Sequence, residues 1–213
     1  MTTPTSSEPT VPAEGADAAV DAVHGVDAVD ALVRFCPPPA DPPPAVDWER
    51  TERALGVALP ADYKRLVETY GGGVFDGTIW LLVPGSAYQD CDLRLRTAER
   101  DEDLAYLWEA GEAKPAELLE AGARVLPWAF EEGTGTFLYW LVRPGRHPDA
   151  WTVLYNEGRG PMWEHHDTGC AAFVLAVLNA TARTSYFGHL YEVLKPTEHR
   201  FETAADTLGA ARP

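Results

Sequence analysis

The strongest constraint on the fold of this chain comes from residues 136–142, TFLYWLV, which are apolar at nearly every position. Successive side chains of a β-strand point to opposite faces of the sheet, so a strand with this pattern is expected to be covered on both faces. Helices of the same chain are the first candidates for that cover, and a partner protein is the alternative. The sequence therefore predicts a central strand inside a layered fold.

The segments around this strand have the pattern of further strands joined by turns. Residues 124–130 precede an acidic, glycine-bearing turn at 131–135. Residues 151–155 read as the next strand, and glycines then return the chain into residues 161–166. Short strands separated by turn residues in this order predict an antiparallel meander.

The first half of the chain predicts two helix ends and an initial strand pair. Gly56 is placed to end one helix, because glycine adopts the left-handed C-cap conformation, and Pro60 is placed to begin the next. Glycines at 71–73 end that second helix, and extended segments follow at 74–75 and 78–83. The apolar face of the second helix is formed by Tyr63, Leu66, Val67 and Tyr70.

Helices and a proline-rich spacer are expected on either side of these elements. A helical stripe at residues 26–35 leads into 36–45, CPPPADPPPA, whose prolines favour an extended polyproline II spacer. The alternative role for these prolines is a ligand for an SH3-type domain. Asp47 is a good N-cap for a short helix.

The later elements are a short strand and three helices. Leu93 and Leu95 alternate with arginines and predict the strand, and a charged helix starts at Glu99. Residues 173–178 supply the apolar face of a C-terminal helix, and a further helix is expected near Tyr191.

Helices first, then hairpin-connected strands, then a helix is the order of an α+β domain. We predict an antiparallel sheet of about five to six strands, flanked by N-terminal helices and a C-terminal helix. The single domain covers residues 26–195, with its proline-rich spacer at 36–45. Residues 1–25 are expected to be a disordered acidic tail, because polar segments cannot offset the entropy of ordering, and residues 196–213 are expected to fray.

Charge is the outstanding property of the composition. The 17 Lys and Arg residues stand against 33 Asp and Glu residues, which gives a formal net charge of −16. Such a balance repels nucleic acid and anionic membranes and attracts basic partners, so no direct nucleic-acid or membrane binding is expected. The alternative is that the acidity only keeps the protein soluble.

The cysteines and the N-terminal sequence indicate a reducing compartment. Cys36, Cys91 and Cys170 are widely spaced without a C-x-x-C pair, which argues against a disulfide framework and a cysteine zinc site. The first residues lack the features of a secretory signal, and no apolar run is long enough to span a bilayer. We therefore expect a cytoplasmic protein.

Few residues suggest catalysis. His165 and His166 are adjacent on a predicted strand, where they point to opposite faces and are poorly placed to chelate one ion. A catalytic pair of Cys170 and a histidine needs a spatial geometry that sequence does not show. Glycines 71–73 follow a helix, whereas the glycines of a phosphate-binding loop precede one. We predict a protein that is not an enzyme and holds no cofactor or metal, with a hydrolase using His165 or His166 as the alternative.

Aromatic residues on the predicted strands, with carboxylates beside them, are the candidates for a partner-binding surface. An aromatic centre ringed by charge is the usual anatomy of a binding hot spot, and carboxylates suit a basic partner. The alternative is that the aromatics fill the core and the carboxylates are solvated turn residues. The candidate residues are Asp76, Trp80, Glu131, Glu132, Trp163, Glu164 and Asp167.

Two blocks of the sequence resemble the SUKH superfamily of Smi/Knr-like proteins. The first is Leu-Gly-x-x-Leu-Pro-x-Asp-Tyr-Lys at 55–64, followed by an amphipathic helix and Tyr-Gly-Gly-Gly at 70–73. The second is Leu-Pro-Trp at 126–128 with Gly-Thr-Phe-Leu-Tyr-Trp at 135–140. The likeness extends over roughly residues 26–182.

This resemblance implies both a fold and a function. Members are α+β proteins, and they include the yeast Smi/Knr-like regulators and many bacterial immunity proteins, which bind and neutralise a toxin that is often a nuclease. They have no catalytic motif to carry over. The resemblance therefore implies a non-enzymatic immunity protein for a basic, nuclease-type polymorphic toxin, and an intracellular scaffold or regulator is the alternative.

Overall fold

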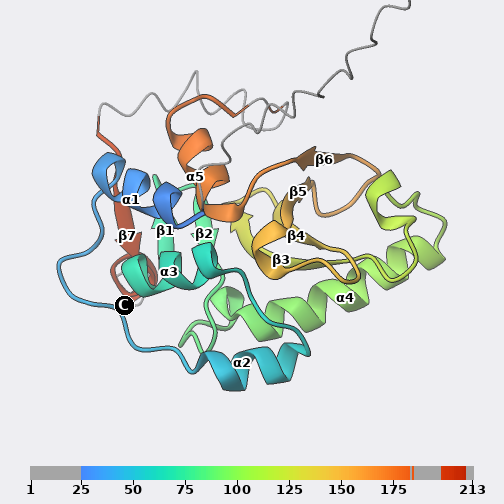
Figure 1. The fold of residues 1–213 in the computed structure, drawn as a ribbon, viewed down its shortest axis with the longest axis horizontal. Helices are drawn as coiled ribbons and strands as arrows, with labels where there is room; N and C mark the ends of the chain where they lie inside the picture. The colour runs from blue at the N-terminus through green and yellow to red at the C-terminus, as the bar shows by residue number, and fades with distance from the viewer. Residues whose placement is uncertain (1–24, 183, 185–197, 210–213) are drawn as a thin grey trace, which may run out of the picture.

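The computed structural model describes residues 25–182, 184 and 198–209 (Figure 1). In these residues the strands are β1 (Gly73–Phe75), β2 (Ile79–Leu81), β3 (Arg124–Glu131), β4 (Phe137–Val142), β5 (Thr152–Asn156), β6 (Trp163–His166) and β7 (Phe201–Thr203). They form one seven-stranded antiparallel sheet in the order β6-β5-β4-β3-β2-β1-β7. The predicted α+β class, with an antiparallel sheet and helices before and after it, is confirmed.

Helices pack on both sides of the sheet. The α-helices are α1 (Gly25–Phe35), α2 (Trp48–Leu55), α3 (Ala61–Tyr70), α4 (Leu93–Glu109), α5 (Cys170–Leu178) and α7 (Ala204–Gly209). Short 3-10 helices are η1 (Gln89–Cys91), η2 (Ala116–Leu118) and η3 (Pro148–Ala150). In Figure 1, α1 and α5 lie along the upper side of the molecule, and α2 and α4 lie along the lower side. Within the described ranges no helix combines the length and apolar character that a membrane crossing needs.

The predicted ends of α2 and α3 are confirmed. Asp47 caps α2, since its carboxylate accepts a hydrogen bond from the backbone N–H of Arg50 at 2.9 Å. Gly56 ends that helix in the left-handed conformation with a φ of 70°. Pro60 precedes α3, and Gly71 ends it with a φ of 74°.

Strand β4 is the covered central strand that its sequence predicts. Leu138 and Trp140 point to a first face of the sheet, where they pack in a large cluster with α1, α3 and α5. Phe137 and Tyr139 point to the second face, where they pack with Leu104 of α4. All six residues of β4 are buried, so helices of this chain cover both of its faces.

A β-bulge explains how β3 accommodates a proline in the middle of the sheet. The pairing of β3 with β4 shifts between Pro127 and Ala129. Proline has no N–H to donate to a neighbouring strand, so within a sheet it is tolerated at such a bulge. The bulge also places Trp128 and Ala129 together in the first-face cluster.

The predicted short strand at Leu93 and Leu95 is wrong, because α4 begins there. Asp92 caps this helix, and its carboxylate accepts hydrogen bonds from the backbone N–H groups of Arg94 and Leu95, both at 2.9 Å. A four-residue alternation of leucine and arginine fits a strand and a helix start equally well, and the cap decides between them.

The C-terminal part of the chain also differs from the expectation of a frayed tail. Residues 201–203 form β7, which pairs with β1, and α7 follows directly. Phe201 packs on Tyr70 and Phe75, with ring centroids 5.0 and 4.7 Å apart. The helix expected near Tyr191 and the acidic tail at 1–24 lie outside the described residues.

Candidate partner-binding surfaces

Trp80 and Trp163, the two predicted aromatic anchors, lie on one cross-strand row of the sheet. Residues directly opposite each other in antiparallel strands share a face, and the row lies on the second face. β2 and β6 are four strand spacings apart, roughly 19 Å, so the two indoles do not form one anchor. The row runs Trp80, Phe130, Phe137, Asn156 and Trp163.

This aromatic row is largely covered by the chain itself. Trp80 is only 2% exposed and stacks on Phe130, with ring centroids 6.0 Å apart. The guanidinium groups of Arg96 and Arg100 lie over the ring of Phe137, at 5.0 and 4.8 Å from its centroid. Trp163 is half-buried at the far end of the row. Trp80 therefore serves as a core residue, and of the two predicted anchors Trp163 is the one that reaches the surface.

The adjacent carboxylates Glu131 and Glu132 point to opposite faces of the sheet. Glu131 is the last residue of β3 and is 4% exposed, and its side chain accepts hydrogen bonds from the hydroxyls of Tyr155 and Thr134. Glu132 is exposed and accepts the indole N–H of Trp80. Glu131 is an interior residue, whereas the sequence placed it on an exposed turn.

Asp76 holds the C-terminal segment against the sheet. It lies in the turn between β1 and β2 with a φ of 49°. Its carboxylate accepts a hydrogen bond from the backbone N–H of Arg200 at 2.9 Å and lies 2.6 Å from Nδ1 of His199. The carboxylate of Asp76 is therefore engaged in contacts within the chain.

The other three candidate residues lie on or just after the edge strand β6. Trp163 packs on Tyr139, with ring centroids 5.4 Å apart. Glu164 lies 3.4 Å from Nε2 of His166. Asp167 is exposed and lines a cavity of about 160 Å³. The structure thus separates this group from Asp76, Trp80 and Glu132 by the width of the sheet.

The histidines and the nearby cysteine have structural surroundings. Nε2 of His165 lies 2.8 Å from the hydroxyl of Thr152, and the ring of His166 packs on Phe173. Burial lowers the pKa of His166. Cys170 is fully buried at the start of α5, and burial raises the pKa of its thiol well above the ordinary value. A thiolate nucleophile is therefore disfavoured at this position.

No set of three or more His, Cys, Asp or Glu side chains in the described part of the chain is placed to hold a metal ion.

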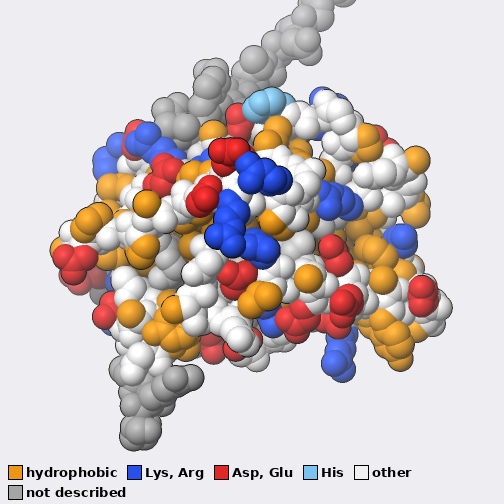
Figure 2. Space-filling model, turned by 90° about the horizontal axis from the view of Figure 1, so that it is seen from below, with side chains coloured by type: hydrophobic (Ala, Val, Ile, Leu, Met, Phe, Trp, Pro, Cys, Tyr) orange, Lys and Arg blue, Asp and Glu red, His pale blue; other side chains and the backbone are white. Residues whose placement is uncertain are grey.

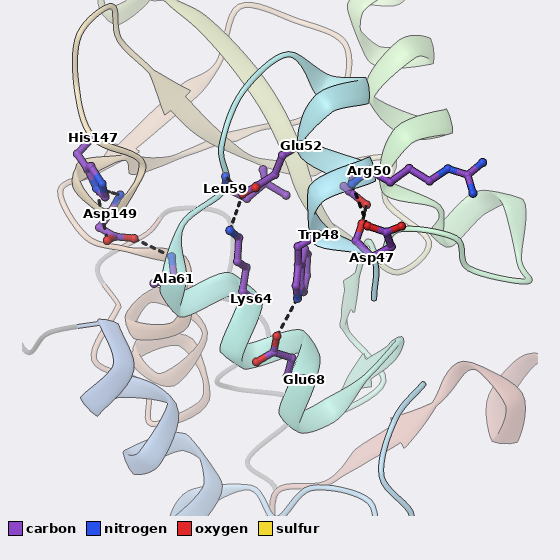
Figure 3. Close-up of polar contacts among 11 residues, drawn as sticks. Asp47, Trp48, Arg50, Glu52, Leu59, Ala61, Lys64, Glu68, His147 and Asp149 are labelled. Atoms are coloured by element: carbon purple, nitrogen blue, oxygen red, sulfur yellow. Dashed lines mark hydrogen bonds and ion pairs between the residues drawn. The ribbon is translucent and has the colours of Figure 1, made fainter. Parts of the chain in front are cut away.

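The residues of the 55–64 block, with their neighbours on α2 and α3, make structural contacts (Figure 3). Glu52 accepts a hydrogen bond from the backbone N–H of Leu59 at 2.7 Å and forms an ion pair with Lys64. Trp48 donates its indole N–H to Glu68 at 2.7 Å, which ties α2 to α3. These contacts of the block are part of the scaffold.

The same block also reaches into the core. Asp62 accepts a backbone N–H bond from Tyr63 at 2.7 Å and one from Ala171 of α5 at 3.2 Å. The hydroxyl of Tyr63 donates to the carbonyl of Leu82. Burial raises the pKa of Asp62 above its ordinary value of 3.8, against the opposing effect of these N–H donors.

The outward side of α4 carries exposed hydrophobic residues among carboxylates. Leu95, Glu99, Glu102 and Tyr106 follow at i, i+4, i+7 and i+11, which places them on one side of the helix. We call them the α4 outer face. Leu95 is 53% and Tyr106 is 71% exposed. Figure 2, which views the molecule from below, shows acidic and hydrophobic side chains intermingled, with basic side chains nearer the centre.

A groove of about 780 Å³ lies on another part of the surface, where segments distant in sequence meet. Its walls are the proline-rich residues 39–46, the loop 83–88, and the C-terminal residues 201 and 203–206. The end of α3 and the glycines that follow it complete the lining. We call it the proline-walled groove.

Sequence reasoning missed both of these surfaces. The α4 outer face includes Leu95, which the sequence pattern assigns to a strand. With that assignment Leu95 and Tyr106 do not belong to one helix, and their common side cannot be recognised. The groove depends on β7, which lies in a segment expected to fray. One available signal was the glycine triplet 71–73, because a helix stop needs a single glycine and two more indicate close backbone approach.

The comparison with protein families agrees with the resemblance of the two sequence blocks. A family model described as SUKH_6, SMI1-KNR4 cell-wall, matches residues 46–168, which is more than half of the chain. The chain belongs to this SMI1-KNR4 family. Neither the curated proteins nor the solved structures include a significant match to it.

Proposed function

We propose that this chain is an immunity-type binding protein that neutralises a basic toxin domain, of the nuclease class, by covering its active surface. SMI1-KNR4-type domains are commonly immunity proteins without catalytic activity, and this chain belongs to that family. A basic nuclease presents lysine and arginine side chains to phosphate groups. A folded acidic surface can occupy the same side chains in place of the nucleic acid.

The observation that carries the proposal is the amount of negative charge and its position. The net charge is −16, whereas a magnitude of about 2–8 is enough for solubility of a small domain. On the α4 outer face, Glu99 and Glu102 lie between the exposed Leu95 and Tyr106. Carboxylates around exposed apolar side chains combine electrostatic steering with an apolar contact.

The first test is protection from toxicity. The proposal expects a toxin gene beside the gene for this chain, and the toxin domain found there is expressed in a sensitive host, with and without the chain. We expect growth to stop with the toxin alone and to resume when the chain is co-expressed. Continued growth arrest in the presence of folded chain contradicts the proposed function.

The second test locates the contact. Reversing Glu99 and Glu102 to Lys should slow association with the toxin roughly tenfold at low salt and flatten its salt dependence, because steering is an electrostatic effect. The matched control reverses Asp30 and Glu198, which changes the net charge equally on a part of the surface away from α4. Equal slowing by both double variants would show that overall charge matters and that the α4 outer face is not the contact.

A further inference from the structure

We propose that the proline-walled groove binds an extended, apolar peptide segment that carries a lysine or arginine. The segment belongs to a partner protein, and its recognition is separate from the α4 outer face. This inference rests on the geometry and chemistry of the groove and is independent of the proposed toxin-binding role.

The three glycines after α3 allow the walls of the groove to come together. A Cβ atom added to Gly71 would lie 2.8 Å from the Cβ of Pro43, and one added to Gly73, just outside the lining, would lie 2.6 Å from the ring of Phe201, which lines the groove. Gly72 faces Val83, with 3.6 Å from its added Cβ to the valine side chain. Each glycine therefore contacts a different wall, and a side chain at 71 or 73 would force two walls apart.

Hydrogen bonds hold each wall in place. The hydroxyl of Tyr70 donates to the carbonyl of Cys36 at 2.6 Å, at the start of the proline-rich segment. The carboxylate of Asp92 accepts the backbone N–H of Gly85 at 2.7 Å, within the loop wall. The N–H of Ala204 donates to the carbonyl of Gly72 at 2.9 Å. The groove is thus preorganised, which lowers the entropic cost of binding a ligand.

The lining selects for a ligand that donates hydrogen bonds and carries positive charge. The proline residues of the 39–46 wall contribute C=O groups and no N–H groups. Among the described residues that line the groove, Asp41 and Asp206 are the charged ones, and neither Lys, Arg nor His is present. Tyr88 and Phe201 add aromatic surface.

A peptide fits these features better than a compact ligand. The groove volume of about 780 Å³ falls within the range of about 300–1,000 Å³ that ligand sites occupy. Prolines favour an extended backbone, and an extended peptide can place apolar side chains along such a wall while its backbone N–H groups face acceptors. A terminal lysine or arginine then reaches Asp41 or Asp206 at the lining.

Two peptides serve as probes, acetyl-Lys-Val-Pro-Leu-Val-Lys-amide and the same sequence with Glu in place of both Lys. Each is titrated into the ¹⁵N-labelled full chain, and amide shifts are followed by NMR. We expect the lysine peptide to cause saturable shifts at Gly72, Gly85 and residues 203–206, and to bind at least tenfold more tightly than the glutamate peptide. Equal binding of the two, or saturable shifts confined to other surfaces, overturns the inference.

A blocking variant and a matched control complete the test. Ala205→Trp places an indole in the groove from an exposed position of α7, and should weaken binding of the lysine peptide at least tenfold. Ala105→Trp makes the same change at an exposed position of α4 and should leave binding unchanged. Asp41→Asn should reduce the preference for the lysine peptide severalfold. If Ala205→Trp binds like the wild type, the groove is not the site, whatever the toxin assay shows.

Discussion

The two faces of the sheet are covered in different ways. On the first face, α1, α3 and α5 form a continuous helical layer over one large apolar cluster. The second face has two smaller clusters, one under α4 and η2 and one under η1 and α7. Buried charged groups occur there too, since Arg100 is 6% exposed and bonds to the hydroxyl of Tyr139 at 2.9 Å.

This difference is the basis on which we assign the first face to the scaffold and propose the second face for partner binding. The helices of the first face also pack on one another, and α5 has five buried residues among its nine. The principal cover of the second face is α4, which turns carboxylates and two exposed hydrophobic residues outward. Exposed apolar side chains with charged residues beside them match the anatomy of a contact surface, with an apolar centre and a polar rim.

The largest expected effect comes from removing a large side chain from the apolar cluster of the first face. Trp140→Ala should lower the free energy of unfolding by about 3–5 kcal/mol, because a large core side chain is lost and a cavity remains. Trp140 is 1% exposed and packs edge-on against Tyr63, with ring centroids 4.7 Å apart. Urea denaturation followed by circular dichroism measures the change.

The matched variant on the second face is Trp163→Ala. Its half-buried ring removes less apolar surface from water, so we expect a loss of about 1–2 kcal/mol. Equal losses for Trp140 and Trp163 would mean that the two faces contribute alike and that the comparison is mistaken.

Smaller effects are expected at Glu131 and Glu132, two neighbouring residues whose side chains point to opposite faces of the sheet. Glu131→Ala should cost about 1–3 kcal/mol, because it leaves the buried hydroxyl of Tyr155 without this acceptor. Glu132→Ala should cost less, about 0.5–1.5 kcal/mol, because the indole N–H of Trp80 loses its acceptor but the carboxylate itself is exposed to solvent. Thermal and urea unfolding of both variants check the difference, and a larger loss at Glu132 would contradict the assignment of faces.

Much of the fold follows from local sequence signals. The caps at Asp47 and Gly56 and the doubly apolar strand β4 depend on short-range chemistry, which sequence displays directly. The start of α4 depends on Asp92, whose capping role competes with an alternating pattern. β7 has three residues, and its stability comes from the packing of Phe201 on Tyr70 and Phe75, which are distant in sequence. The local sequence therefore does not predict this strand.

The candidate site was less predictable because burial is a tertiary property. The sequence places Trp80 on a strand and Glu131 in an exposed turn. In the structure α7 and η1 pack over the tryptophan, and the hydroxyl of Tyr155 from β5 bonds to the carboxylate. The α4 outer face and the proline-walled groove depend on which segments meet in space. The composition still predicts that the proposed partner is basic, since folding does not change the net charge.

The smallest expected effect concerns Asp62, a titratable group within the first-face layer. Burial raises its pKa above the ordinary 3.8, so the folded state keeps the proton at pH values where the unfolded state has released it. The contribution of Asp62 to stability is therefore greatest below about pH 3.8, and falls as the pH rises toward the folded-state pKa.

The variant Asp62→Asn has no titratable group at this position. The unfolding free energy of the wild type minus that of the variant should therefore decrease as the pH rises above 3.8, and should become constant at higher pH. Urea denaturation between pH 3.5 and about pH 7 measures it, with Asp41→Asn as the baseline at an exposed carboxylate. A difference that increases with pH would mean that the N–H groups of Tyr63 and Ala171 stabilise the anion more than burial disfavours it. The first-face layer would then contain a stabilised charge at Asp62, as the second face does at Arg100.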